Sequence, residues 1–175
     1  MASKVLFETK LTDIKSTDIE GVGSLRVENG ADGGVYRWVK NRNATAFTAK
    51  QPVCYDAGNV GSKVLLQKVN SPVTADLMLA AGIAVTAIEA SGSKCYGWVK
   101  VQGYFQDARV ITPATGGNDI EIGSELIAVD GQTYLTYQSN AGTAPIYAHN
   151  FKALETVATA TGAAVVSKDV YINCL

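Results

Sequence analysis

The stretch Ile83–Gly103, IAVTAIEASGSKCYGWVKVQG, contains two runs of strand-forming residues on either side of a Gly/Ser turn. Its second run, Tyr96–Val101, is built from aromatic and β-branched side chains, which favour a pleated, half-buried strand. Gly97 stands between two aromatic rings, and this position indicates either a close backbone approach or a β-bulge. The run lacks the residues of a reaction centre, so we expect Tyr96 and Trp98 to pack a core or a subunit interface.

The same kind of signal recurs along the whole chain. Seventeen glycines and only four prolines fall mainly between short apolar runs, a punctuation typical of turns in an all-β protein. The predicted strands are 24–28, 35–39, 52–55, 63–68, 83–88, 96–101, 108–111, 125–129, 133–137, 152–156 and 165–174. Asp130-Gly131 separates two of them and predicts a hairpin with a type I′ turn. The predicted fold is therefore an all-β, small β-barrel or β-sandwich with short strands and Gly-rich turns.

The first 22 residues differ from the remainder. Charged side chains alternate there with few apolar ones, which predicts an extended, loosely attached N-terminal arm. Thr17 and Glu20 have capping-box spacing, but Gly21 and Gly23 would end a helix at once. Residues 23–175 are expected to form a single β domain. A weak internal similarity leaves open a division into two similar β units, 23–111 and 112–175.

The composition limits the classes of function that this chain can have. Of 175 residues, 47% are hydrophobic and 18% charged, which is too apolar for a disordered chain. Fifteen basic and sixteen acidic side chains give a net charge of −1, so no overall field attracts nucleic acid or a membrane surface. The start of the chain has no apolar signal region, and no run reaches transmembrane length. We therefore expect synthesis in a cytoplasm and neither a nucleic-acid nor a membrane partner.

Residues that carry chemistry are sparse and scattered. His149 is the single histidine, and Cys54, Cys95 and Cys174 are too far apart in sequence for a zinc motif, so they are expected to be buried free thiols. The glycine-rich segments 21–24 and 30–34 lack the ending of a phosphate-binding loop. A calcium site at 118–121 lacks EF-hand spacing. The chain is predicted not to be an enzyme and to hold no cofactor and no metal, although a hydrolase would require a cleft joining His149 to a carboxylate and a hydroxyl.

The segment Arg37–Arg42, RWVKNR, combines cations with an aromatic ring. Such a pattern suits phosphate contacts and base stacking, but it also suits an exposed hairpin that faces a protein partner. Because the chain as a whole is not basic, the partner-facing surface is the favoured interpretation.

Several of these segments together resemble the head decoration, or cement, proteins of tailed bacteriophages. The resemblance covers most of the chain from about Gly23 onward. It is carried by 23–30, 36–41, 44–46, 51–55, 82–88, 96–103, 153–158 and 170–173. The excursion 58–82 departs from the usual pattern.

The resemblance implies a virion structural protein, synthesised in the host cytoplasm, that sits on the capsid exterior. It implies a homotrimer that stabilises the shell by bridging subunits of the major capsid protein. Candidate capsid or subunit contacts are Lys4, Phe7, Lys10, Arg26, Arg37, Trp38, Lys40 and Arg42. The alternative function is that of a fibre or adsorption protein whose loops at 115–119 and 138–145 bind a host glycan or protein.

Overall fold

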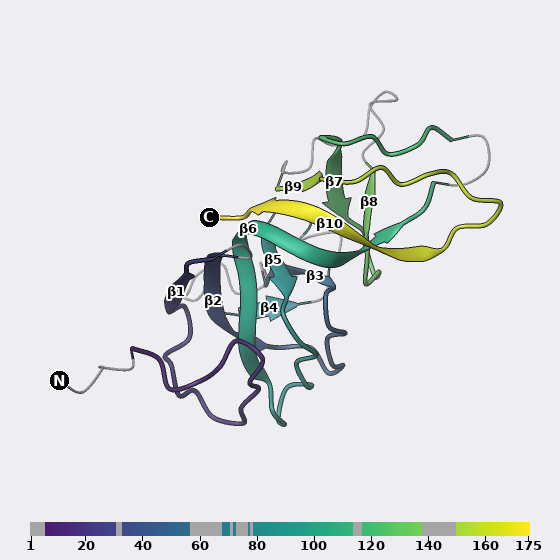
Figure 1. The fold of residues 1–175 in the computed structure, drawn as a ribbon. Helices are drawn as coiled ribbons and strands as arrows, with labels where there is room; N and C mark the ends of the chain where they lie inside the picture. The colour runs from purple at the N-terminus through teal and green to yellow at the C-terminus, as the bar shows by residue number, and fades with distance from the viewer. Residues whose placement is uncertain are drawn as a thin grey trace.

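The computed structural model describes residues 6–30, 33–56, 68–70, 72, 77, 79–113, 117–137 and 150–175. The predicted all-β class is confirmed: the described residues form strands and no helix. The strands, in chain order, are β1 (Leu25–Glu28), β2 (Gly34–Asn41), β3 (Pro52–Tyr55), β4 (Lys68–Asn70), β5 (Ala80–Ala84), β6 (Tyr96–Ile111), β7 (Glu125–Ala128), β8 (Leu135–Tyr137), β9 (Phe151–Ala153) and β10 (Val165–Asn173). Figure 1 shows their arrangement.

Five of these strands close a barrel. The pairs β2–β4, β4–β3, β3–β5, β5–β6 and β6–β2 form a complete circuit, in which only β2–β4 is parallel. Strand β1 lies outside it and pairs with β2 alone. We call this circuit the first ring. It occupies the lower part of the view in Figure 1.

Strand β6 is long enough to take part in a second closed circuit of paired strands. After its pairing with β2 ends at Gly103, β6 continues along β10, and β10–β9, β9–β7 and β7–β8 follow. The circuit closes through one residue pair, Val110 with Leu135, between β8 and β6. We call it the second ring. Both rings therefore depend on one shared strand.

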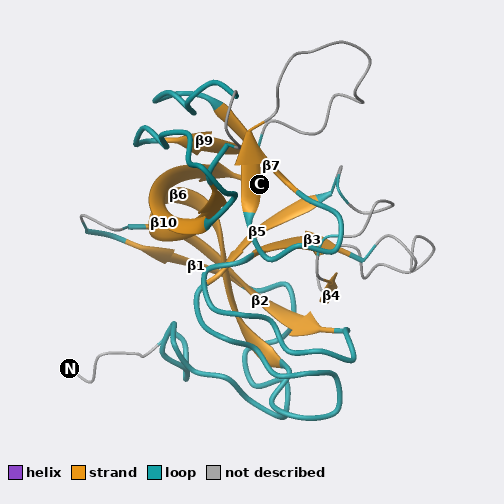
Figure 2. Cartoon of the chain, turned by 90° about the vertical axis from the view of Figure 1, so that its right-hand side faces the viewer, coloured by secondary structure: helices purple, strands orange, loops and turns teal. Residues whose placement is uncertain are grey.

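The shared strand bends where it passes from one ring to the other. The β6–β10 register shifts between Lys168 and Val170, so that two β6 residues lie opposite Asp169, which is a β-bulge. Asp107, at the bulge, has φ 60° and forms an ion pair of 2.8 Å with Lys50, whose φ is 66°. The Asp169 carboxylate accepts hydrogen bonds from the Tyr104 hydroxyl and from the Asp107 amide. Figure 2, seen from the side, shows β6 and β10 coiling together at this position.

A single apolar cluster runs through both rings. Its buried members in the first ring include Val39, Ile83 and Val99, and those in the second include Leu126 and Phe151. These side chains alternate along their strands, because successive residues of a strand point to opposite faces. Burial of this apolar surface is the main stabilising contribution to the fold.

The structure also corrects several local expectations. The strand expected at 83–88 lies at Ala80–Ala84, and the strands expected at 96–101 and 108–111 are one strand, β6. The hairpin expected at Asp130-Gly131 is confirmed between β7 and β8, but the type I′ turn predicted for it is wrong. Only Gly131 has positive φ there, and the Gln132 amide donates to the Val129 carbonyl, which describes a type II turn.

Gly97 is a crowded position, but neither the backbone approach nor the bulge expected there is present. A Cβ at this position would lie 2.9 Å from the side chain of Ile88, which is fully buried. The neighbour is thus a core side chain and not a backbone, and the register shift of β2 with β6 lies elsewhere, at Val35/Tyr36. Trp98 packs the molecule, as predicted.

Candidate functional site

The N-terminal segment 6–22 lies against the outer face of the first ring. The indole nitrogen of Trp98 donates to the Thr9 hydroxyl at 2.9 Å, and the indole nitrogen of Trp38 donates to the Asp18 carboxylate at 3.0 Å. Lys15 exchanges two backbone hydrogen bonds of 3.0 Å with Tyr96. The loose attachment expected for this arm is wrong for residues 6–22, because buried indole groups need partners and the arm supplies them.

Internal hydrogen bonds fix the shape of this segment. The Glu20 carboxylate accepts from the Thr9 amide at 2.6 Å and from the Thr9 hydroxyl at 2.7 Å. The Asp18 carboxylate accepts from the amides of Gly21 and Val22 at 3.0 and 2.9 Å. No helix begins at Thr17, since Asp18 and Glu20 are engaged in these other contacts.

Aromatic rings and cations stack beneath the segment. The ring centroids of Trp38 and Trp98 lie 5.2 Å apart, and Phe7 meets Trp98 edge-on at 5.5 Å. The Arg26 guanidinium lies 5.4 Å from the Phe7 centroid and 5.8 Å from that of Trp98. It also donates to the Thr9 carbonyl at 2.6 Å. Arg26 therefore joins β1 to the N-terminal segment, and a guanidinium over an aromatic face is itself attractive.

A groove opens beside this stack, along the free edge of β1. It has a volume of about 460 Å³ and is lined by Leu6, Phe7, Leu25, Arg26, Val27 and Glu28. Three of the lining side chains are apolar and exposed, Leu6 by 81%, Val27 by 67% and Leu25 by 46%. Arg26 and Glu28 form an ion pair within the groove. The groove is thus an exposed, apolar and electrically balanced surface on a rigid support.

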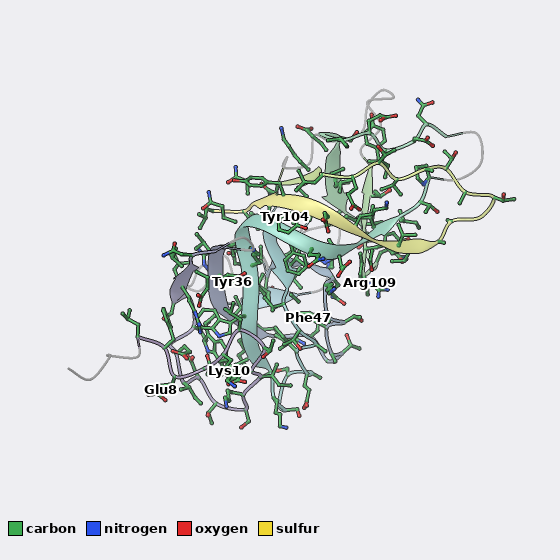
Figure 3. All side chains as sticks on the ribbon, viewed as in Figure 1. Glu8, Lys10, Tyr36, Phe47, Tyr104 and Arg109 are labelled. Carbon is green, nitrogen blue, oxygen red and sulfur yellow. The ribbon has the colours of Figure 1, made fainter. Side chains whose placement is uncertain are left out.

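The predicted contact residues are distributed unevenly. Phe7 and Arg26 line the groove, and Lys10 lies exposed on the N-terminal segment, where Figure 3 labels it beside Glu8. Lys40 is half-buried, 5.3 Å from the Tyr96 ring centroid, and Arg42 is exposed with its guanidinium 3.5 Å from the Asp56 carboxylate. Lys4 lies outside the described residues, as do His149 and most of the two loops considered for host binding.

Arg37 and Trp38 are not on the surface, so the exposed hairpin predicted for them is wrong. Trp38 has no exposed area, because the N-terminal segment covers its face of β2. Arg37, buried on the opposite face, donates a hydrogen bond to the Tyr55 hydroxyl and stacks over its ring at 5.6 Å. Neither side chain is available to a partner.

Two titratable side chains near Arg37, Tyr55 and Cys174, have raised pKa values. Burial raises the pKa of Tyr55, and the Arg37 charge opposes that shift without cancelling it. Burial, followed by the nearby Cys54, raises the pKa of the Cys174 thiol well above its usual range. A thiol held protonated in this way is a poor nucleophile. All three cysteines are free and buried, as predicted.

A second group of exposed apolar side chains lies on the second ring. Its members are Ile122, Leu154, Val165 and Tyr171, together with Leu175 at the C-terminus. The Gly123 amide donates to the Ala153 carbonyl at 2.8 Å, so Ile122 and Leu154 are on adjoining segments. The molecule therefore exposes apolar surface on the second ring and also beside the first ring, on β1 and the N-terminal segment.

Leu6, Leu25, Val27 and the second-ring group were not among the residues predicted from the sequence. A signal for β1 exists in Leu25-Arg26-Val27-Glu28, where apolar and charged residues alternate before the Asn29-Gly30 turn. That alternation predicts a strand with one apolar face. It does not show that the strand lies at a sheet edge, since strand order depends on distant segments.

Two further observations limit the chemistry of the described residues. None of the clusters of His, Cys, Asp and Glu there has the three members needed to hold a metal ion. At 118–121, the Asp119 carboxylate instead accepts a hydrogen bond of 2.6 Å from the Thr159 amide. Within the same ranges, no helix is long and apolar enough to span a bilayer. The chain matches no protein-family model and no curated protein.

Proposed function

We propose that this protein is a virion structural protein that binds the outer surface of a tailed-phage capsid and stabilises it by bridging major capsid protein subunits. The observation that carries the proposal is the exposed apolar surface at two separate places, on β1 and Leu6 beside the first ring and on the second ring, in a molecule whose two rings share one apolar cluster. A bridge requires two contact surfaces held at a fixed separation. Exposed apolar groups gathered on a surface are typical of protein interfaces.

Other features support this function over a catalytic one. The residues with displaced pKa values in the core, Tyr55 and Cys174, are held in their neutral forms inside the protein. The groove beside β1 is lined by apolar groups and one internally neutralised ion pair, which suits a protein partner better than a small polar substrate. The sequence resemblance to decoration proteins points in the same direction.

The direct test mixes the purified protein with undecorated capsid shells of its phage. Sedimentation should show the protein bound to shells, and bound shells should break apart at a higher temperature than bare ones. Repeated contacts on one shell would strengthen binding beyond that of a single copy. If wild-type protein neither binds nor stabilises the shells, the proposed function is wrong.

A pair of variants locates the capsid contact. Ile122→Asp with Leu154→Asp places charges on the exposed surface of the second ring and should abolish shell binding, because an unpaired charge in an apolar interface is costly. Ile19→Asp, at an exposed apolar position of the N-terminal segment, is the matched control and should bind like the wild type. Equal binding by both variants would move the contact away from the second ring.

A further inference from the structure

Strand β1 ends its sheet. Among the described residues it pairs only with β2, so one edge of β1 carries no strand. Trp38 exchanges backbone hydrogen bonds with Gly23 and Ser24, and alternation along the ladder then makes Arg26 and Glu28 the hydrogen-bonded positions facing β2. The backbone groups of Leu25 and Val27 consequently point to the free edge, which is the edge that the groove follows.

An exposed apolar edge strand invites pairing with another chain, and proteins usually protect such edges. Here β1 contains no proline, and its register with β2 is regular from Leu25 to Glu28. Instead, Val27 and Leu25 stand exposed beside Leu6. A strand that pairs with this edge must present apolar side chains on one face. On its other face it must present charges that complement one positive and one negative group.

The sequence of β1 itself meets both requirements. When two copies of β1 run antiparallel with Val27 opposite Val27 of the second copy, Arg26 lies opposite Glu28 of the second copy, and Glu28 lies opposite its Arg26. Residues directly opposite share a face of the sheet, so the apolar side chains gather on one face and the four charges alternate on the other. The arrangement uses the same patch on both partners, as a two-fold contact requires.

We propose that β1 is a self-pairing edge, at which a second copy of this chain adds its own β1 in antiparallel register centred on Val27. The added pairing extends the sheet as β2–β1–β1–β2 across the two copies and covers the groove in each. This contact goes beyond capsid binding: it uses the exposed surface of β1 and leaves that of the second ring uncovered, so a dimer presents two second-ring surfaces to a shell. It differs from the trimer that the family resemblance implies, because pairing a strand with its own copy generates a two-fold axis.

The register can be tested by cross-linking with Val27→Cys. In an antiparallel ladder a hydrogen-bonded pair has its Cα atoms about 5.5 Å apart, which is within the range that a disulfide spans. Mild oxidation should therefore give a disulfide-linked dimer rapidly, with little background because the three native cysteines are buried. Val165→Cys, exposed on β10, is the matched control. If Val27→Cys cross-links no faster than this control, the proposal is wrong.

Charge exchange gives a second test that a merely structural role would not pass. Arg26→Glu alone, or Glu28→Arg alone, places like charges opposite each other twice and should weaken self-association by at least about tenfold. A mixture of the two variants restores two attractive pairs and should form the mixed dimer, detected by native mass spectrometry. Failure of the mixture to associate while the wild type does so would overturn the register.

The remaining occupants of the groove give distinct outcomes, all measured in solution without capsid shells. Deleting residues 1–5 should leave the dimer intact. Loss of association would instead assign the groove to the N-terminal residues of a neighbouring copy and overturn the proposal. A monomer up to about 1 mM, or a three-fold particle alone, would overturn it as well. None of these results bears on whether the protein binds a capsid, so the two proposals can fail separately.

Discussion

The two halves of β6 have different surroundings although they belong to one strand. From Tyr96 to Val101 nearly every residue is buried, whereas from Gln102 to Ile111 buried residues alternate with more exposed ones. The first half is covered on one face by the core and on the other by the N-terminal segment, while the second half has the core on one face only. A strand buried on both faces needs apolar residues at consecutive positions.

The same difference separates the two rings. The first ring has a second apolar cluster outside its barrel, formed by Tyr36, Trp38 and Trp98 with partly buried residues of the N-terminal segment. The second ring has no described counterpart of that segment, and its outer apolar side chains remain exposed. The comparison shows that the N-terminal segment, only about seventeen residues long, is enough to bury the aromatic side chains on the outer face of the first ring. The predictions below test how much of the fold depends on it.

The largest effect is expected from Trp98→Ala. Trp98 has no exposed area and contacts Phe7, Trp38 and the Thr9 hydroxyl, so its removal leaves a cavity between barrel and segment. The free energy of unfolding should fall by about 3–5 kcal/mol, measured by chemical denaturation. Tyr171→Ala, at an exposed aromatic position on the second ring, is the matched control and should cost less than about 1 kcal/mol. Similar losses in both variants would contradict the comparison.

Asp18→Ala should have a smaller effect. It removes the acceptor of the Trp38 indole and the cap of the Gly21 and Val22 amides, for an expected loss of about 1–2 kcal/mol. Asp13→Ala removes a half-exposed carboxylate of the same segment, which lies 3.7 Å from the Lys15 ammonium and accepts a hydrogen bond of 3.2 Å from the Lys10 amide, and it should cost about 0.5 kcal/mol. Faster amide hydrogen exchange at Gly21 and Val22 in the first variant only would confirm that the segment loosens locally.

A third test concerns Cys174, whose buried thiol is not part of the N-terminal segment that covers the first ring. Burial raises the pKa of its thiol, so the folded chain keeps a proton that the unfolded chain releases above about pH 8.5. Stability should therefore be unaffected by this group below that pH and should fall above it, by up to about 1.4 kcal/mol per pH unit. Cys174→Ala should flatten the curve between about pH 8.5 and 10.

The control for this pH dependence is Ile172→Val, two residues before Cys174 and on β10. It trims a buried side chain and should lower stability by about 1 kcal/mol at every pH without changing the slope. Denaturation curves across the alkaline range distinguish the two variants. An unchanged slope in Cys174→Ala would show that the thiol does not carry the effect.

The smallest effect is expected at the junction between the rings. Asp107→Gly relieves a left-handed backbone position that costs a non-glycine residue about 1 kcal/mol, but it also removes the half-exposed ion pair with Lys50. These contributions offset, so stability should change by less than about 1 kcal/mol. Glycine at Lys50, the other positive-φ position, gives a matched comparison. A loss above about 2 kcal/mol would show that the Asp107 carboxylate holds the two rings in register.

Much of the fold follows from local signals in the sequence. The strands at Pro52–Tyr55 and Leu25–Glu28, and the hairpin around Gly131, lie where alternation and turn residues indicate, because these signals act between near neighbours in the chain. Fold class was therefore within reach of the sequence.

The contact surface was predicted less well. Alternation in Arg37–Arg42 suggested a solvent face, but Trp38 is covered by residues more than fifteen positions away and Arg37 turns into the core. The phase of a strand shows which residues share a face and does not show what covers that face. Likewise, the free edge of β1 depends on the order of strands from the whole chain. Phe7 and Arg26 are the two predicted contact residues that line the groove beside β1.

The shared strand also sets an order of events during synthesis. All the strands of the first ring lie between Gly34 and Gly103, so that ring has its full complement when the ribosome has released little more than half of the chain. The second ring needs β10, which ends at Asn173, two residues before the C-terminus. A nascent chain thus carries a closed barrel from which the second half of β6 extends without its partner until β10 has been synthesised, and a premature stop after Ile111 would leave that strand permanently unpaired on this side.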